Sequence, residues 1–265
     1  MRLPIYQVDA FADRVFAGNP AAVVPLDSWL PDAQLQAIAA ENNLAETAYF
    51  LRSDDVFELR WFTPAVEVDL CGHATLATAF VIATLLEPGR DRMDFVTRQA
   101  GTLTVTRDGD LFTLDFPSRP AEPIGSPDPG LVAALGGPAP QAILGGRDYL
   151  VVYEDEAAVR GLKPDMAALA RLDRFAVCVT APGAGGGGVD FVSRLFAPAQ
   201  GIPEDPVTGS THCMLIPYWA ARLGKDRLAA RQVSARGGDL ACALAGNRVK
   251  IGGRAALYLE GTITV

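Results

Sequence analysis

The chain has 265 residues, of which 49% are hydrophobic and 20% charged, values typical of a folded globular protein rather than a disordered one. Its formal net charge is −8 and it contains no run of basic residues, which argues against a nucleic-acid-binding surface. An anionic ligand would therefore need a locally positive pocket.

The first half is predicted to be rich in strands and to contain two helices. The segment 32–42 has apolar residues on one face and follows Pro31, which favours a helix start. A second helix is predicted over 72–86; it is apolar nearly all round and should be buried. Strands are predicted at 4–11, 21–24, 47–51 and 57–62, and a hairpin in 95–116 with its turn at Asp108-Gly109-Asp110.

The second half is predicted to begin after a linker rich in Pro and Gly, 117–140, which holds one short helix at 131–135. Further helices are predicted at 165–172 and at 209–223, where Gly224 would cap the second buried helix. The segment 183–188 is glycine-rich but lacks a phosphate-binding pattern, so we expect a hairpin tip. Strands are predicted at 149–153, 175–180, 190–195, 232–235, 241–244, 248–251 and 256–259.

Targeting and redox signals are few. The residues before the first predicted strand do not resemble a signal peptide, and no apolar stretch is long enough to span a bilayer. The four cysteines have no metal-ligand spacing. We therefore expect a cytoplasmic protein with reduced thiols, without a bound metal and without membrane contact.

A short pattern occurs twice in the chain. Residues 60–64 (RWFTP) precede Gly72-His73, residues 194–198 (RLFAP) precede Gly209-Ser210, and each copy continues into an apolar helix. A duplicated strand–turn–helix unit predicts two similar halves that face a shared cleft. The predicted fold is α+β, with two pseudo-symmetric domains that each wrap a strand-rich, barrel-like sheet around a central helix. The predicted domains are 1–117 and 118–265, and the last strand could cross back to the first.

Two candidate residues of the first half could carry acid/base chemistry. Glu46 lies where a helix gives way to a strand, among small and apolar residues. A lone Glu is usually a solvated turn residue, but a carboxyl in apolar surroundings has a raised pKa that suits proton transfer near neutral pH. His73 lies in the first turn of the buried helix, where backbone N–H groups lack helical partners. The alternative for His73 is a core or capping histidine.

Two further candidates lie in the second copy of the pattern. Asp205 precedes a proline, which is also common in ordinary turns. Gly209-Ser210 matches Gly72-His73 and could be a plain helix cap, but a helix start with glycine also suits a bound carboxylate or phosphate. If the two helix starts meet, Glu46, His73 and Asp205 would surround a bound anion.

Several sequence blocks, in this order, resemble the PhzF-like phenazine-biosynthesis family. They are VDAF (8–11), FAGNPAAV (16–23), NLAETAY (43–49), RWFTP (60–64), LCGHAT (70–75) and EDPVTGSTH (204–212). The resemblance implies the fold of diaminopimelate epimerase and a cofactor-free isomerisation. In the namesake enzyme a glutamate moves a proton between two carbons of a dihydro-hydroxyanthranilate.

The resemblance also implies roles for single residues. The motif places the proton-transferring glutamate at Glu46. It implies that His73, Asp205 and Ser210 assist proton transfer and hold the substrate, while Gly72 and Gly209 present backbone donors.

Related racemases use two thiols, one in each half, in Cys-Gly turns. This chain keeps Cys71 before Gly72 but has Thr208 before Gly209. A threonine hydroxyl cannot act as the second base, so Cys71 is interpreted as a packing residue. A single carboxylate such as Glu46 can instead remove a proton from one carbon and return it to another on the same face.

Three functions stay open at this point. The leading hypothesis is a cofactor-independent isomerase that acts on a small carboxylate through Glu46. The second is an epimerase or racemase with Glu46 and Asp205 as opposed bases, and the third is a non-catalytic metabolite-binding protein. A role in phenazine synthesis does not follow from the family resemblance. An exposed strand edge could support a homodimer, although no sequence feature requires one.

Overall fold

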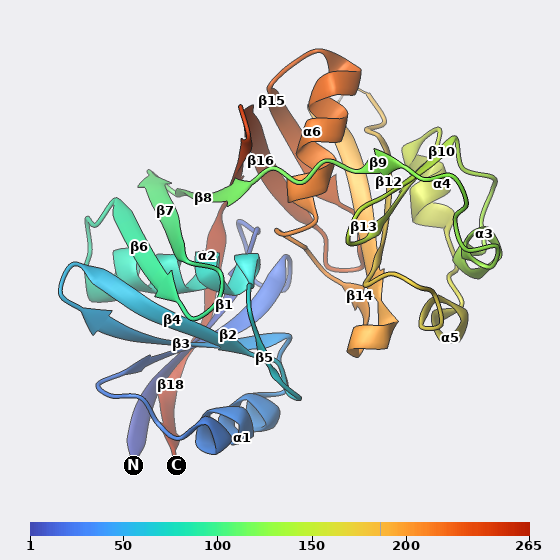
Figure 1. Cartoon of the computed structure of the whole chain (residues 1–265). Helices are drawn as coiled ribbons and strands as arrows, with labels where there is room; N and C mark the ends of the chain where they lie inside the picture. Colours follow the sequence, from blue (N-terminus) through green and yellow to red (C-terminus); the bar gives the residue numbers. More distant parts are fainter. Residues whose placement is uncertain (186) are drawn as a thin grey trace. The chain divides into compact units, whose positions relative to one another are not determined.

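The computed structural model describes residues 1–185 and 187–265 (Figure 1). The predicted hairpin tip at 183–188 includes residue 186, which lies outside the described residues; on either side of it, Pro182 pairs with Phe191 in an antiparallel ladder. The chain forms two compact units: unit 1 comprises Met1–Phe116 and Lys250–Val265, and unit 2 comprises Pro117–Val249. The fold is α+β, as predicted.

Unit 1 is a strand-rich body with two helices. The helices are α1 (Asp32–Asn42) and α2 (Gly72–Val81), which continues as the π-helical turn η1 (Ile82–Leu86). The strands are β1 (Arg2–Ala10), β2 (Asn19–Leu26), β3 (Glu46–Ser53), β4 (Val56–Phe62), β5 (Glu67–Val68), β6 (Arg92–Thr97), β7 (Thr102–Asp108), β8 (Leu111–Pro117) and β18 (Ala255–Thr264). β18 pairs with β1 along its length, so the C-terminal strand belongs to unit 1.

Unit 2 contains shorter elements. Its helices are α3 (Leu131–Leu135), α4 (Glu156–Gly161), α5 (Met166–Leu169), the 3₁₀ turn η2 (Pro198–Gln200) and α6 (His212–Leu223). Its strands are β9 (Glu122–Pro123), β10 (Ala142–Gly145), β11 (Tyr149–Val152), β12 (Val177–Pro182), β13 (Phe191–Ala197), β14 (Ile202–Asp205), β15 (Arg227–Gln232) and β16 (Gly238–Ala245), while β17 (Arg248–Gly253) begins in unit 2 and ends in unit 1.

The same pairing order occurs inside each unit. In unit 1, β2 is parallel to β3, β3 antiparallel to β4, and β4 parallel to β6, which continues antiparallel to β7. Unit 2 repeats this series of parallel and antiparallel pairs in the strand order β11, β12, β13, β15 and β16. In each unit the long buried helix connects the two strands of the second parallel pair. The sequence repeat therefore corresponds to a repeated topology.

Strand alternation in unit 1 separates two buried faces. Tyr49, on one face of β3, packs in a cluster with Leu35 and Ile38 of α1. Glu46, Ala48 and Phe50 project to the opposite face, where α2 contacts β1, β2 and β3. The polar side chain of Glu46 is thus directed toward the buried helix rather than toward solvent.

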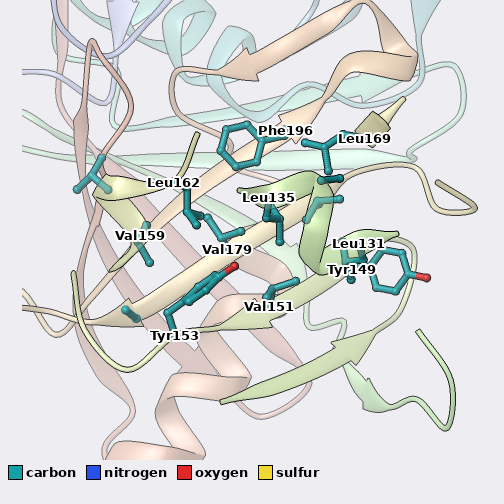
Figure 2. Close-up of a cluster of buried hydrophobic side chains, with 14 of the residues drawn as sticks. Leu131, Leu135, Tyr149, Val151, Tyr153, Val159, Leu162, Leu169, Val179 and Phe196 are labelled. Carbon is teal, nitrogen blue, oxygen red and sulfur yellow. The ribbon is translucent and has the colours of Figure 1, made fainter. Parts of the chain in front are cut away.

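Unit 2 also buries both faces of its strands. Figure 2 shows the cluster on one face, where Val151 of β11 and Val179 of β12 pack against side chains of α3, α4 and α5. Thr180, the next residue of β12, lies on the other face and accepts a hydrogen bond from Trp219 Nε1 of α6 at 2.9 Å. Short helices therefore cover one face and α6 covers the other.

α6 contains Pro217, which removes the hydrogen bond that a helix would give to the carbonyl of Cys213. The backbone N–H of Arg119 donates to this carbonyl at 2.9 Å. The segment that leads into unit 2 therefore satisfies the acceptor that the proline leaves open.

Some predicted boundaries are wrong. The strand predicted at 232–235 ends at Gln232, and β15 instead begins at Arg227. The helix predicted from 209 begins at His212, because Gly209 and Ser210 form a tighter turn closed by His212 N–H to Gly209 O at 3.1 Å and Cys213 N–H to Ser210 O at 3.2 Å.

In the described parts of the chain, no helix combines the length and apolar character needed to cross a bilayer.

Candidate active site

Glu46 and His73 come from two elements of unit 1 that meet in its interior. Glu46 is the first residue of β3, and His73 is the second residue of α2. Both are buried, with 8% and 5% of their surfaces exposed. The predicted pair is therefore brought together, and Gly72 lies beside it as the first residue of the helix.

The two side chains meet at ion-pair distance. His73 Nε2 lies 3.1 Å from Glu46 Oε2, without the alignment of a linear hydrogen bond. Among the described residues, this buried oxygen makes no aligned hydrogen bond, which leaves its lone pairs available to accept a proton. This oxygen is therefore the strongest candidate for a base in unit 1.

The other nitrogen of the His73 ring has its own neighbours. Asn19 Nδ2 lies 3.2 Å from His73 Nδ1, and Cys71 Sγ lies 3.5 Å from the same atom. Asn19 is the first residue of β2, and Cys71 is the N-cap residue of α2. The imidazole is thereby held between three side chains.

Burial and charge act in opposite directions on these groups. Burial raises the pKa of the Cys71 thiol, and the negative charge of Glu46 raises it further. Burial alone lowers the pKa of His73, but its contacts with Cys71 and with the carboxylate of Glu46 outweigh burial and raise that pKa above its ordinary value. Because Cys71 is a neutral thiol near pH 7, Glu46 is the anion that acts on the imidazole there.

Glu46, Cys71 and His73 also form a set of potential metal ligands. One donor atom from each lies within 4.8 Å of the others, a spacing that a single ion could bridge. A Cys, a His and a carboxylate would suit zinc. The expectation of metal-free chemistry therefore stays a prediction and needs a direct test.

The predicted residues of unit 2 lie in the turn between β14 and α6. Asp205 ends β14, and its Oδ2 atom accepts a hydrogen bond from Thr208 Oγ1 at 2.5 Å. Gln232 clamps this turn: its Nε2 donates to Asp205 O at 2.7 Å and to Thr208 Oγ1 at 3.2 Å, and its Oε1 accepts from Thr208 N at 2.9 Å. Asp205 and Thr208 are thus held in one orientation.

Gly209 and Ser210 do not open α6 as Gly72 and His73 open α2. They lie in the turn before it, and Ser210 is only half-buried. His212, the first residue of α6, directs Nδ1 toward Thr208 O at 2.8 Å, and burial lowers its pKa to about 4. The two histidines of the chain therefore have opposite electrostatic environments.

The duplicated arginines have a structural role. Arg60 pairs with both carboxylate oxygens of Glu67 at 2.7 and 2.8 Å, and its guanidinium lies 5.0 Å from the ring centre of Phe62. Arg194 pairs with Glu204 at 2.8 and 3.0 Å and lies 4.9 Å from the ring centre of Phe196. The arginines of the repeat therefore fix the strand that precedes each buried helix.

Two contacts at these sites do not follow from the sequence analysis. From the sequence, Asn19 is predicted only as part of a turn. In the structure it shares a strand face with the apolar Ala21 and Val23. A polar residue at this position of an otherwise apolar face is the signal that could have identified it. Gln232 gives no comparable signal, because its role depends on a turn that is distant in sequence. The predicted strand also begins at residue 232, whereas the observed strand β15 ends there.

Comparisons with known proteins agree on one family. A family model described as phenazine biosynthesis-like protein matches residues 8–261. A relative from Pseudomonas aeruginosa, described as an uncharacterized isomerase, is 54% identical over 263 residues and covers 99% of both chains. A solved PhzF-family structure from Enterococcus faecalis matches with a TM-score of 0.95, 48% identity and full coverage of both chains.

A more distant likeness supports the fold alone. A hydroxyproline epimerase from Agrobacterium vitis, solved with bound trans-4-hydroxy-L-proline, matches with a TM-score of 0.58 at 14% identity. The match covers 99% of this chain and 91% of that one. The strand-rich α+β architecture is therefore shared with epimerases.

Proposed function

This chain belongs to the phenazine biosynthesis-like family, and on that premise we propose that it is an isomerase that uses Glu46 to move a proton on a small carboxylate-bearing metabolite. Relatives in the comparisons are named as isomerases. The observation that carries the proposal is the buried contact between Glu46 Oε2 and His73 Nε2.

The proposed reaction begins with Glu46 as a general base. Its carboxylate removes a proton from a carbon next to the substrate's carboxylate or to an unsaturated bond, the resulting carboxylic acid exchanges its proton with solvent, and it then delivers a proton to a second carbon. Such a positioned acid/base group contributes about 10²- to 10⁴-fold to the rate. Because one carboxylate performs both steps, the reaction needs no redox partner. The product is an isomer of the substrate.

His73 supports this cycle from 3.1 Å. A proton on His73 Nε2 stabilises the Glu46 carboxylate before Glu46 removes the substrate's proton. When this imidazole proton moves out of the contact, the protonated form of Glu46 is favoured. The first N–H groups of α2, at Gly72 and His73, have no partners within the helix and suit the substrate's carboxylate. Asp205, Gly209 and Ser210 stay proposed substrate-contacting residues on the strength of the family motif alone, and Cys71 is not a base in this scheme.

The test uses solvent deuterium, because the substrate is not identified. Wild-type protein and the Glu46→Gln variant are incubated in D₂O with a bacterial metabolite extract and with dihydro-hydroxyanthranilate, and products are read by mass spectrometry and NMR. We expect wild type to place deuterium on a carbon of a small carboxylate and to change its double-bond position, while Glu46→Gln does neither. Exchange with inversion at a single stereocentre would instead identify an epimerase.

A further inference from the structure

The two ring nitrogens of His73 face chemically different groups. Nε2 faces a carboxylate oxygen, Glu46 Oε2 at 3.1 Å, whereas Nδ1 faces an amide nitrogen, Asn19 Nδ2 at 3.2 Å, and a sulfur, Cys71 Sγ at 3.5 Å. A neutral imidazole carries one proton, and the partners of the two nitrogens decide which of them holds it.

An amide nitrogen can only donate a hydrogen bond. Nδ1 must therefore accept from Asn19 and offer its lone pair. The Cys71 thiol, whose Sγ atom lies 3.5 Å from Nδ1, can donate a weak hydrogen bond to the same nitrogen. Both neighbours thus favour an unprotonated Nδ1.

From this geometry we propose that Asn19, assisted by Cys71, is a positioning residue that holds neutral His73 in its Nε2–H tautomer, so that the only ring proton faces Glu46. The role in turnover rests on the proposed function, but the tautomer itself does not. Cys71 thereby acts as a donor within the site rather than as a second base.

The local structure supports this role for Asn19. The residue is fully buried at the start of β2, on the strand face that also carries Ala21 and that contacts α2. Ala21 is in register with Glu46 in the parallel β2–β3 pair. The same pair of strands therefore supplies the groups for both sides of the His73 ring.

His212 provides an internal reference of the opposite kind. Its Nδ1 atom lies 2.8 Å from the carbonyl oxygen of Thr208, which can only accept, so Nδ1 carries the proton. His212 Nε2 has no hydrogen bond within the described residues. The chain has only two histidines, so both tautomers can be observed in one spectrum.

The direct experiment is ¹⁵N NMR on wild-type protein labelled at the histidine rings, recorded above the titration of His73. The ring protons are correlated with their nitrogens, and the two residues are assigned with the His212→Asn variant. We expect the His73 proton on Nε2, with Nδ1 at the downfield position of a bare nitrogen, and the reverse for His212. A His73 proton on Nδ1 overturns the proposal, because Asn19 would then present its amide oxygen.

Variants of Asn19 test the consequence for turnover. Asn19→Leu removes the donor, and Asn19→Asp replaces it with an acceptor that favours a proton on Nδ1. We expect both to lower kcat about 10- to 100-fold for the carboxylate labelled by wild type, with KM changed less. In Asn19→Asp, NMR at the pH at which wild-type His73 is neutral should show both nitrogens of His73 protonated, because the added carboxylate favours a proton on Nδ1.

The matched control is Asn42→Leu at the end of α1. This substitution also removes an amide, one that is half-buried and donates to Thr47 Oγ1 at 3.0 Å. Because the Asn42 amide bonds Thr47 rather than the His73 ring, the variant should keep the wild-type kcat and the wild-type histidine spectrum. A loss of kcat in Asn42→Leu equal to that in Asn19→Leu would count against a specific role for Asn19.

Substitutions at Cys71 separate donation from packing. Cys71→Ser keeps a donor and should preserve the Nε2–H tautomer, whereas Cys71→Ala removes it and should weaken the preference. If Asn19→Leu folds and retains the wild-type spectrum and kcat, Asn19 is not a positioning residue. If Glu46→Gln retains turnover while the spectrum is as expected, the proposed function fails and the tautomer assignment stands.

Discussion

Glu46 Oε2 and His73 Nε2 lie 3.1 Å apart inside unit 1, one at the start of a strand and the other in the first turn of a buried helix. The contact forms because strand alternation directs Glu46 to the face of β3 that α2 covers. A carboxylate and an imidazole placed this way can share a proton, so a change at either residue should alter the protonation of the other.

The first prediction concerns the titration of His73. Burial lowers the His73 pKa, whereas the contacts with Cys71 and with the carboxylate of Glu46 raise it above its ordinary value. In Glu46→Gln the carboxylate's charge is absent, so the His73 pKa should fall. Histidine-resolved NMR titration of both proteins measures the change, with His212 as the internal control. An unchanged His73 titration would mean that the two side chains are not electrostatically coupled.

The second prediction concerns the pH dependence of stability. Burial lowers the His212 pKa from 6.5 to about 4 in the folded protein. Between these values the unfolded chain binds a proton that the folded chain does not, so the free energy of unfolding should decrease as pH falls from about 6.5 to about 4. The decrease due to this residue is about 3 kcal/mol.

The comparison protein for this experiment is His212→Asn, which keeps a donor for Thr208 O but does not titrate. Urea unfolding at pH 7 and at pH 4.5 should show a smaller loss of stability in the variant than in wild type. Equal losses in the two proteins would show that His212 is not the group responsible.

The third prediction concerns the clamp on Asp205. Gln232→Leu would remove the hydrogen bonds that the Gln232 amide makes to the N–H of Thr208 and to the carbonyl of Asp205 in a buried place. We expect a loss of about 1–3 kcal/mol of unfolding free energy from the loss of these buried hydrogen bonds. Turnover should also fall, since Asp205 would lose its fixed orientation.

The matched substitution for the clamp is Gln141→Leu. Gln141 is exposed, and its side chain accepts one hydrogen bond from Arg222 at 3.2 Å. Its loss should change stability by no more than about 0.5 kcal/mol. Similar urea midpoints for the two variants would argue that Gln232 does not stabilise the turn.

The fourth prediction concerns metal. The donor atoms of Glu46, Cys71 and His73 are close enough for one ion, but the proposed chemistry needs none. Dialysis against a chelator, followed by metal analysis, should therefore leave deuterium incorporation at the wild-type rate. Activity that disappears on chelation and returns with added Zn²⁺ would assign the three residues to a metal centre.

The elements predicted best from sequence are those whose local signals and packing agree. The helix at 32–42 and the short helix at 131–135 have the predicted bounds, and the buried helix from Gly72 continues to Leu86 as expected. Helix α4 at 156–161 is not predictable from the sequence, although Asp155 caps it, because its six residues are too few to show a helical period.

The candidate site is predictable only in part. Glu46 and His73 carry recognisable sequence blocks, and their contact follows from the strand and helix that hold them. The contacts of Asn19 and Gln232 depend on which strands become neighbours, which local sequence does not specify. The matching roles of Arg60 and Arg194 are likewise visible in the sequence only as a repeat, because their glutamate partners are placed by the fold.

The central claim is that the Glu46 carboxylate transfers the substrate's proton. Its most direct test is the rate of deuterium incorporation from D₂O by wild type and by Glu46→Gln, at equal concentrations and with the folded state checked by thermal unfolding. We predict that the variant retains its fold and loses about 10²- to 10⁴-fold of the rate. Incorporation by a folded Glu46→Gln protein at the wild-type rate would contradict the claim.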